Sequence, residues 1–419
     1  MKKIRFPIFI NSLLLILIAS FGINSSAQEP VRIAFMDPLS GAFAAIGTSG
    51  LKQLQFAADY FYNSKGGILD GRMIEIVPLD NKQSPTETQI QFRRAVSEEL
   101  RIIFQGNSSA VANTLNQTIN RYNRRNPGQE VLQINYSAVD PILTEENCSF
   151  WHFRFDAHAA MKLNVLTDYI AKQESIKSMY IIGQDYSFGQ AVSDISISLL
   201  AEKRPDIEIV GNEFHPIGQV KDFTPYVTKI VSSGADAVIT GNFGADMVSL
   251  AKSIIDSGLD IPIYTFYAAY DGITATLGAD GKNKIHLIHN ETSNPIPTER
   301  RKDYMRAYKA ANPNRDVTQP RLVNALQMIV QAMEQTQSTD PYDIALALED
   351  MRFMTLSDEE IWMRGDDHQI FQSLHLSVQT DEEIEFDADN SGFGLFSFFH
   401  VPAEETIVET SCQMRRPRR

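Results

Sequence analysis

The chain of 419 residues lacks the marks of several protein classes. Its 52 Asp and Glu outnumber 38 Lys and Arg, and the net charge of −14 argues against a nucleic-acid surface, which needs clustered cations. The one basic run, RRPRR at 415–419, reads as a solvated tail. No Walker loop or GxSxG elbow occurs, since GTSG at 47–50 lacks the frame. The sequence therefore gives little support to an enzyme.

Cysteines and long apolar runs are also scarce. The one long apolar run, FPIFINSLLLILIASFGI, follows the basic start MKKIR and precedes the small residues of NSSAQ. This order predicts a cleaved secretory signal over 1–27, with an uncleaved anchor as the alternative. The only cysteines are Cys148 and Cys412, without CxxC or zinc spacing. In an oxidising compartment they favour one disulfide, and two unpaired buried thiols are the alternative.

From residue 31 onward, segments of strand length alternate with segments of helical periodicity. A first series predicts strands at 31–36, 73–80, 101–105 and 130–136, with helices at 49–63, 84–100 and 110–122. A second predicts strands at 178–183, 207–214, 235–240, 261–266 and 284–291, with helices at 189–203, 222–234 and 245–258. Helices at 298–312, 321–334 and 340–351 and strands at 370–379 and 393–401 follow. Two such series predict an α/β protein of two lobes with parallel central sheets flanked by helices.

Small polar residues follow two strands of the first series. Ligands of parallel sheets bind beyond the carboxyl ends of the strands, and helix N-termini attract carboxylates. Ser108 and Ser109 are therefore candidate ligand-binding residues, and plain helix capping, which the local pattern alone favours, is the alternative. Ser137 and Ala138 follow the next strand, where a turn built on Asp140 is the alternative.

Large aromatic residues follow three strands of the second series. Tyr186 and Phe188 lie in GQDYSFGQ, Phe243 in TGNFGAD and Tyr267 in YTFYAAYDG. We interpret them as a cover for a ligand, and core packing is the alternative for each.

Two polar clusters are candidates for metal or catalytic groups. His152, Arg154, Asp156 and His158 share one face of a strand by their period of two. Arg154 would repel a cation there, so mutual pairing of these polar side chains is favoured over a metal site. Asp366, Asp367 and His368 are interpreted as a surface turn.

An ordered set of motifs resembles the extracytoplasmic solute-binding proteins of the branched-chain amino-acid (Leu/Ile/Val-binding) type. The stretch at 38–81 carries Ser40-Gly41, Gly47, Asn63, Gly66-Gly67, Gly71-Arg72 and Asp80 at the places typical of that family. NSSA, QDYSFG, GADAVIT, SGLDIPIYT and MRGDDHQ follow in the family's order. The resemblance covers the chain from about residue 31 onward.

The resemblance implies a type I periplasmic-binding fold, with two lobes joined by three hinge strands near 152, 287 and 360. It divides the chain into a signal peptide (1–27), an N-terminal lobe (28–152 plus 288–360) and a C-terminal lobe (153–287 plus 361–419). It implies no catalysis and no cofactor. It implies a periplasmic monomer that captures a small solute, binds no nucleic acid and delivers the solute to an inner-membrane ABC permease. A ligand sensor of the same fold is the alternative, and a neighbouring permease or sensor-kinase gene would discriminate the two.

The family's binding residues match this chain in part. Ser108, Ser109, Ser137 and Ala138 match the carboxylate-binding side, but Val139 replaces a usual threonine. Tyr186 or Phe188, with Phe243, match the closing side. In that family a carboxylate binds the ammonium group of an amino acid. It has no clear counterpart around Tyr267, and Asp271 lies further along the chain than the family's position. The expected solute is therefore an amino acid or related carboxylate, with aromatic carboxylates and amides also open.

Overall fold

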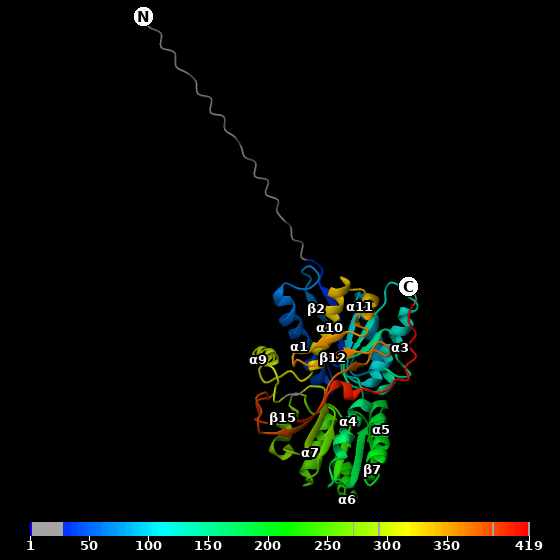
Figure 1. Cartoon of the computed structure of the whole chain (residues 1–419), viewed down its shortest axis with the longest axis vertical. Helices are drawn as coiled ribbons and strands as arrows, with labels where there is room; N and C mark the ends of the chain where they lie inside the picture. The colour runs from blue at the N-terminus through cyan, green and yellow to red at the C-terminus, as the bar shows by residue number, and fades with distance from the viewer. Residues whose placement is uncertain (2–27, 271, 292–293, 388, 418–419) are drawn as a thin grey trace.

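The computed structural model describes residues 1, 28–270, 272–291, 294–387 and 389–417. Apart from Met1, the predicted signal peptide lies outside these residues. Two lobes follow one another along the long axis of the molecule (Figure 1). In the described part of the chain, no helix has the length and apolarity needed to cross a membrane.

The first lobe is built on a five-stranded parallel sheet, in the order β2-β1-β3-β4-β5. Its strands are β1 (Val31–Asp37), β2 (Ile74–Asp80), β3 (Ile102–Gln105), β4 (Leu132–Asn135) and β5 (His152–Arg154). The helices packed on it are α1 (Ala44–Phe61), α2 (Pro85–Ser97), α3 (Ser109–Asn123), α9 (Glu299–Ala311), α10 (Pro320–Thr336) and α11 (Pro341–Leu348). Strands β3, β4 and β5 are buried along their whole length because helices cover both faces of the sheet.

The second lobe contains a seven-stranded sheet, in the order β15-β14-β10-β9-β8-β6-β7. Its strands are β6 (Ser178–Gln184), β7 (Glu208–His215), β8 (Ala237–Thr240), β9 (Ile263–Thr265), β10 (Ile285–His289), β14 (Leu374–Thr380) and β15 (Gly394–Val401). The first five strands are parallel, while β14 and β15 add an antiparallel edge. The helices of this lobe are α4 (Ala159–Ile170), α5 (Ser187–Lys203), α6 (Thr224–Ser233), α7 (Ala245–Asp256) and α8 (Ile273–Leu277). The predicted α/β class with parallel central sheets is confirmed.

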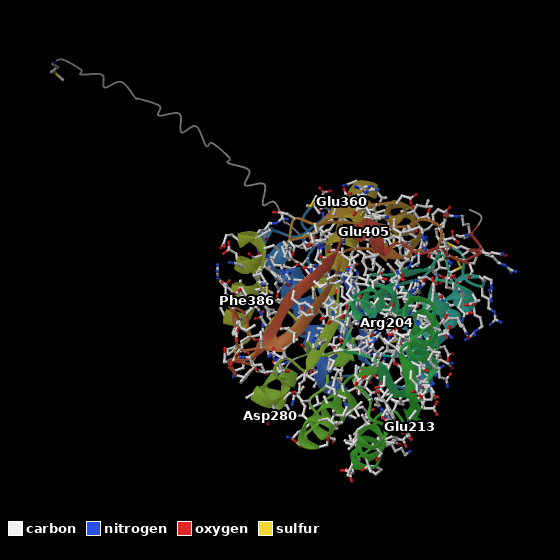
Figure 2. The ribbon with its side chains drawn as sticks, turned by 60° about the horizontal axis from the view of Figure 1, so that its bottom comes forward. Arg204, Glu213, Asp280, Glu360, Phe386 and Glu405 are labelled. Atoms are coloured by element: carbon white, nitrogen blue, oxygen red, sulfur yellow. A yellow bond between two sulfur atoms is a disulfide. The ribbon has the colours of Figure 1, made fainter. Side chains whose placement is uncertain are left out.

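A small antiparallel sheet lies where the chain passes between the lobes. It consists of β11 (Arg352–Met354), β12 (Glu360–Met363) and β13 (Ile370–Phe371). Short 3-10 helices are η1 (Asn63–Lys65), η2 (Pro141–Leu143), η3 (Gly278–Gly281) and η4 (Ala403–Thr406). In the view of Figure 2, Glu360 on β12 and Glu405 on η4 lie above Glu213 and Asp280 of the second lobe.

The two lobes have separate hydrophobic cores. Ile361, Met363 and Ile370 pack in the first core, whereas Phe371 and Leu374 pack in the second. The segment that contains these residues thus packs against both cores. The predicted lobe boundaries at 152, 287 and 360 stay a prediction.

Two helices begin earlier than their apolar periodicity predicts. Helix α1 begins at Ala44 rather than Ser49, and α5 at Ser187 rather than Gly189. The initial turns contain Gly47 and Gly189, which are poor helix formers and weaken the sequence signal. A Cβ on either glycine would lie 1.9 Å from a carbonyl oxygen of the preceding strand end. The first turn of each helix thus packs directly against the strand it follows, close to the site.

Candidate functional site

The loop between β3 and α3 forms one wall of the site. Ser108 occupies the N-cap position of α3, but its side chain makes no capping hydrogen bond and its φ of 72° lies in the left-handed region. Ser109 Oγ accepts a hydrogen bond from the backbone N of Asp140 at 3.2 Å. Plain capping therefore does not explain the two serines. A non-glycine residue held at positive φ is strained, and such residues concentrate at binding sites.

The buried carboxylate of Asp37 holds this loop in place through hydrogen bonds. Asp37 Oδ1 accepts from the backbone N of Gly106 (3.3 Å) and of Asn107 (3.0 Å), while Oδ2 accepts from Asn107 Nδ2 (3.0 Å) and from the Tyr136 hydroxyl. A Cβ on Gly106 would lie 2.7 Å from the Tyr136 ring, so the loop can pass over that ring only as glycine. Patterns in the sequence did not point to Asp37, Asn107 and Tyr136. These residues are far apart along the chain, and only the register of the sheet brings them together.

The end of β4 forms the adjoining wall. Asn135 Oδ1 accepts from the backbone N of Ser137 (3.2 Å) and of Ala138 (2.8 Å), which bends the chain at the rim. Asp140 Oδ1 accepts from the backbone N of Ile142 at 3.2 Å and caps η2, so the predicted turn at Asp140 is confirmed. The side chain of Ser137 remains directed to the site, where its Oγ accepts from Arg321 Nη2 at 3.0 Å.

Aromatic rings from the second lobe close the other side. The ring centroid of Phe243 lies 6.4 Å from that of Tyr186 and 5.9 Å from that of Tyr267, and Tyr267 stacks on Tyr270 at 6.1 Å. The Tyr267 hydroxyl donates to the backbone O of Ser137 at 3.2 Å, a direct bond between the lobes. Phe188 lies behind these rings and is only 1% exposed, in the first turn of α5 rather than in the expected turn.

These walls line a cavity of about 230 Å³ that is partly open to solvent. Its lining residues are Gly106, Asn107, Ser108, Ser109, Ser137, Ala138, Tyr186, Phe243, Tyr267 and Tyr270. The structure thus brings together every predicted ligand-binding residue except Phe188, which supports the cover from behind. Asn107 and Tyr270 were missed, although Tyr270 belongs to the aromatic stretch after β9.

Charged side chains of both signs lie next to the cavity, and Asp37 contacts the lining residues Gly106 and Asn107. Arg321 Nε lies 3.5 Å from Asp156 Oδ2, and Lys162 Nζ lies 2.9 Å from Asp156 Oδ1, so two buried cations share one carboxylate. Lys162 Nζ also lies 5.9 Å from the centre of the Tyr267 ring. The lining contains no acidic side chain among the described residues, and Asp271 lies outside them.

The hydrogen bonds of His152 and Arg154, in the polar face at 152–158, go to other segments of the chain. Arg154 Nε donates to Gln369 Oε1 at 2.7 Å, and its Nη1 donates to the backbone O of Asp140 at 2.6 Å. His152 Nε2 lies 3.1 Å from Asn135 Nδ2. The prediction of pairing within the face was therefore wrong in its partners, because β5 is buried between β4 and the segment after β12.

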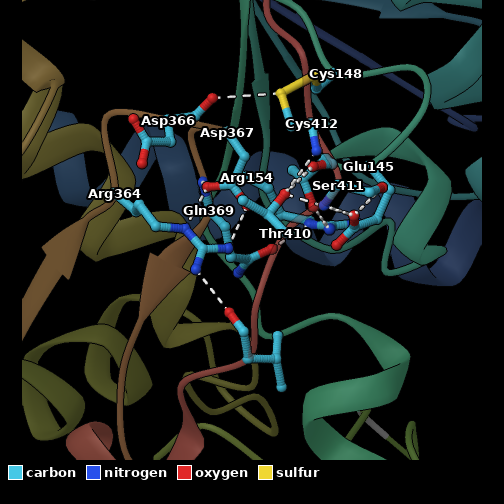
Figure 3. Close-up of polar contacts among 12 residues, drawn as sticks. Glu145, Cys148, Arg154, Arg364, Asp366, Asp367, Gln369, Thr410, Ser411 and Cys412 are labelled. Carbon is cyan, nitrogen blue, oxygen red and sulfur yellow. Dashed lines mark hydrogen bonds and ion pairs between the residues drawn. A yellow bond between two sulfur atoms is a disulfide. The ribbon is translucent and has the colours of Figure 1, made fainter.

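The structure joins Cys148 and Cys412 in a disulfide with their Cα atoms 5.8 Å apart. Figure 3 shows this bond beside the segment at 364–369. Residues 408–416, which we name the C-terminal strap, also form hydrogen bonds at both ends. The backbone O of Val408 accepts from Arg364 Nη1 at 2.7 Å, and Arg416 Nη1 donates to Glu349 Oε1 at 2.6 Å.

The predicted surface turn at 366–368 is wrong at two of its three residues. Asp367 and His368 are 1% and 0% exposed, because the C-terminal strap and β5 cover them. Arg364 Nε donates to Asp367 Oδ1 at 2.8 Å, and His368 Nε2 lies 2.9 Å from Glu349 Oε1. The turn therefore belongs to the packing between segments.

Two α/β lobes with a cavity between their strand ends define the class of two-lobed solute-binding proteins with the type I fold. The family model for periplasmic binding proteins matches residues 30–381, and the chain belongs to this family. The resemblance inferred from the motifs is confirmed. The family binds solutes and is not enzymatic, so the chain is a solute-binding protein and not an enzyme.

Relatives match nearly the whole chain. The Leu/Ile/Val-binding protein homolog 4 of Brucella abortus is 30% identical over 410 residues, covering 94% of this chain and 95% of the relative. The closed crystal structure of a leucine-, isoleucine-, valine-, threonine- and alanine-binding protein from Brucella ovis matches with a TM-score of 0.80 and 29% identity, covering 93% of this chain and 100% of that chain. A solute-binding protein of R. palustris in complex with benzoate shares the fold at 17% identity and a TM-score of 0.77, covering 92% and 99% of the two chains.

Proposed function

We propose that this chain captures a small carboxylate-bearing solute in the periplasm and delivers it, as a monomer, to an ABC permease of the inner membrane. One observation carries the proposal: a cavity between the lobes is lined by polar residues of the first lobe and by aromatic residues of the second. A solute that contacts both walls stabilises the closed arrangement over the open one, and this differential affinity is what drives closure.

The first lobe binds the carboxylate in this proposal. The hydroxyls of Ser108 and Ser109 lie at the N-terminus of α3, a helix of 15 residues, where free backbone N–H groups and the helix dipole favour an anion. Arg321 adds a cation behind Ser137. Asp37 holds the loop in place, so the donors are oriented before the solute arrives.

The second lobe covers the rest of the solute with aromatic rings. The Brucella ovis relative is described as binding leucine, isoleucine, valine, threonine and alanine, so a related amino acid is one candidate class. A buried ammonium needs an acceptor, and the described lining offers no acidic side chain for it. We therefore favour an aromatic or apolar carboxylate or an amide-bearing carboxylate over a free zwitterion.

The test is titration calorimetry of the purified chain with solutes first selected by thermal shift. The screen contains leucine, valine, benzoate, 4-hydroxybenzoate, phenylacetate and a carboxylate-bearing amide, because a bound solute raises the apparent stability. We expect Ser108→Ala combined with Ser109→Ala to weaken binding at least about thirtyfold, since two donors to a charged group are lost.

The matched control is Ser232→Ala combined with Ser233→Ala, an adjacent serine pair on α6 outside the cavity, which should bind with unchanged affinity. Equal affinity of the 108/109 double variant and the wild type would contradict the assignment of the carboxylate site.

A further inference from the structure

Three metal-ligating side chains gather at a place that shares no residue with the lining of the solute cavity. Glu359, His375 and His400 each offer one ligand atom, and these atoms all lie within 4.8 Å of one another. Glu359 precedes β12, whereas His375 lies on β14 and His400 on β15. Within the described part of the chain, this is the one group of three such side chains.

The backbone fixes the positions of all three groups. His375 and His400 are directly opposite in the antiparallel ladder of β14 and β15, and their ring centroids are 4.7 Å apart. The backbone O of Glu359 accepts from the backbone N of Thr355 at 2.9 Å, and its side-chain Oε2 accepts from the Ser373 hydroxyl. Two of the donors are therefore held by the ladder of β14 and β15, and the third by hydrogen bonds in the turn between β11 and β12.

One donor atom in this cluster has no protein partner. His375 is 6% exposed, and its Nε2 is buried without a hydrogen-bond partner among the described residues. It lies 3.7 Å from Glu359 Oε1, too far for a hydrogen bond. A buried imidazole nitrogen without a partner is costly, and a metal ion beside it would satisfy both this nitrogen and the carboxylate.

The surrounding charges permit a cation. Arg301 is the nearby positive group, and its Nη1 lies 3.2 Å from Glu291 Oε2, which balances its charge. The neighbouring His289 binds Ser377 Oγ through Nε2 at 2.6 Å and is already engaged.

We propose that Glu359, His375 and His400 bind one divalent transition-metal ion of the zinc type. Two imidazoles and one carboxylate form a donor set that suits Zn²⁺, whereas Mg²⁺ and Ca²⁺ prefer oxygen donors alone. Tetrahedral zinc at ~2.1 Å from each ligand places ligand atoms ~3.4 Å apart, so the cluster must contract slightly. The side chain of His400 is exposed and has the freedom to do this. Water would complete the coordination of the ion.

The bound ion would join two parts of the molecule. Strand β12 packs in the first core through Ile361 and Met363, while β14 and β15 form the edge of the second sheet (Figure 1). An ion held between them would therefore cross-link the passing segment to that edge, and it would stabilise the folded chain independently of any solute.

The test uses the full chain purified without a polyhistidine tag, with ZnCl₂ as the probe in calorimetry and thermal unfolding. We expect one Zn²⁺ per chain and a raised Tm, with no response to MgCl₂. Glu359→Gln and His400→Ala should each weaken the zinc affinity by more than about tenfold and abolish the rise in Tm.

The matched control is His286→Gln, which removes a histidine of β10 outside the cluster and should leave zinc binding unchanged. His400 is exposed, so His400→Ala keeps the test valid if Glu359→Gln fails to fold. Failure of the wild type to bind Zn²⁺, or equal zinc affinity in both cluster variants and the wild type, would overturn the proposal. Neither result would affect the solute site.

Discussion

At the scale of single residues, the site depends on side chains that never touch the cavity surface. Asp37 is fully buried and accepts hydrogen bonds from the loop that carries the serines. Burial raises the pKa of Asp37 from 3.8 to about 6, against the opposing hydrogen bonds from Tyr136, Asn107 and Gly106. The loop geometry is thus maintained by an anion that the protein interior disfavours.

This raised pKa predicts a pH dependence of stability. Between pH 3.8 and about 6 the folded chain keeps a proton on Asp37 that the unfolded chain has lost, so the free energy of unfolding falls as the pH rises. The fall amounts to about 3 kcal/mol in total. Asp37→Asn does not titrate and should lack this component in urea unfolding between pH 3.5 and 7. Parallel pH profiles of the variant and the wild type would contradict the prediction.

At the scale of elements, the C-terminal strap ties the end of the chain to the region where the lobes meet. The disulfide joins residues separated by 264 positions, and Ser411 N donates to Glu145 Oε2 at 2.6 Å beside it (Figure 3). A cross-link over so long a loop removes many conformations from the unfolded chain. The strap therefore stabilises the fold without contributing to the cavity.

We expect Cys148→Ser combined with Cys412→Ser to lower the free energy of unfolding by about 2–5 kcal/mol. Denaturant unfolding measures this loss, and solute affinity below the transition should remain that of the wild type because the strap does not line the cavity. Ser411→Ala, which keeps the disulfide, is the control and should cost less than about 1.5 kcal/mol. A double variant as stable as this control would contradict the role of the disulfide.

At the scale of the whole molecule, a direct hydrogen bond between lining residues joins the two lobes across the cavity. Tyr267 reaches Ser137 across the gap, and Arg321 of α10 reaches the same residue from the side of the first lobe. Contacts that form only on closure set the balance between the open and closed arrangements.

Closure on the solute predicts a change in overall dimensions. Small-angle X-ray scattering should show a smaller radius of gyration when the solute identified in the screen is added, because hinge closure brings the lobes together. Ser108→Ala combined with Ser109→Ala should remain in the open form at the same solute concentration. An unchanged radius of gyration in the wild type at saturating solute would contradict closure.

Local patterns in the sequence were sufficient for the class of fold and for most of the candidate site. Strand and helix alternate with clear periodicity, and polar or aromatic residues stand at the strand ends, where parallel sheets place their ligands. Ser108, Ser109 and Ser137 could be selected in this way. The helix starts at Ala44 and Ser187 could not be predicted, because a glycine in the first turn obscures the periodicity.

Only the tertiary structure decided which distant residues support these positions. Arg321 reaches Ser137 from 184 residues away, and Asp37 meets Tyr136 because β1, β3 and β4 are neighbours in the sheet. The pairing of His375 with His400 likewise depends on the register of β14 and β15. Sequence periodicity determines which face of an element is buried, but strand order and register determine what lies opposite it, and these depend on packing over the whole chain.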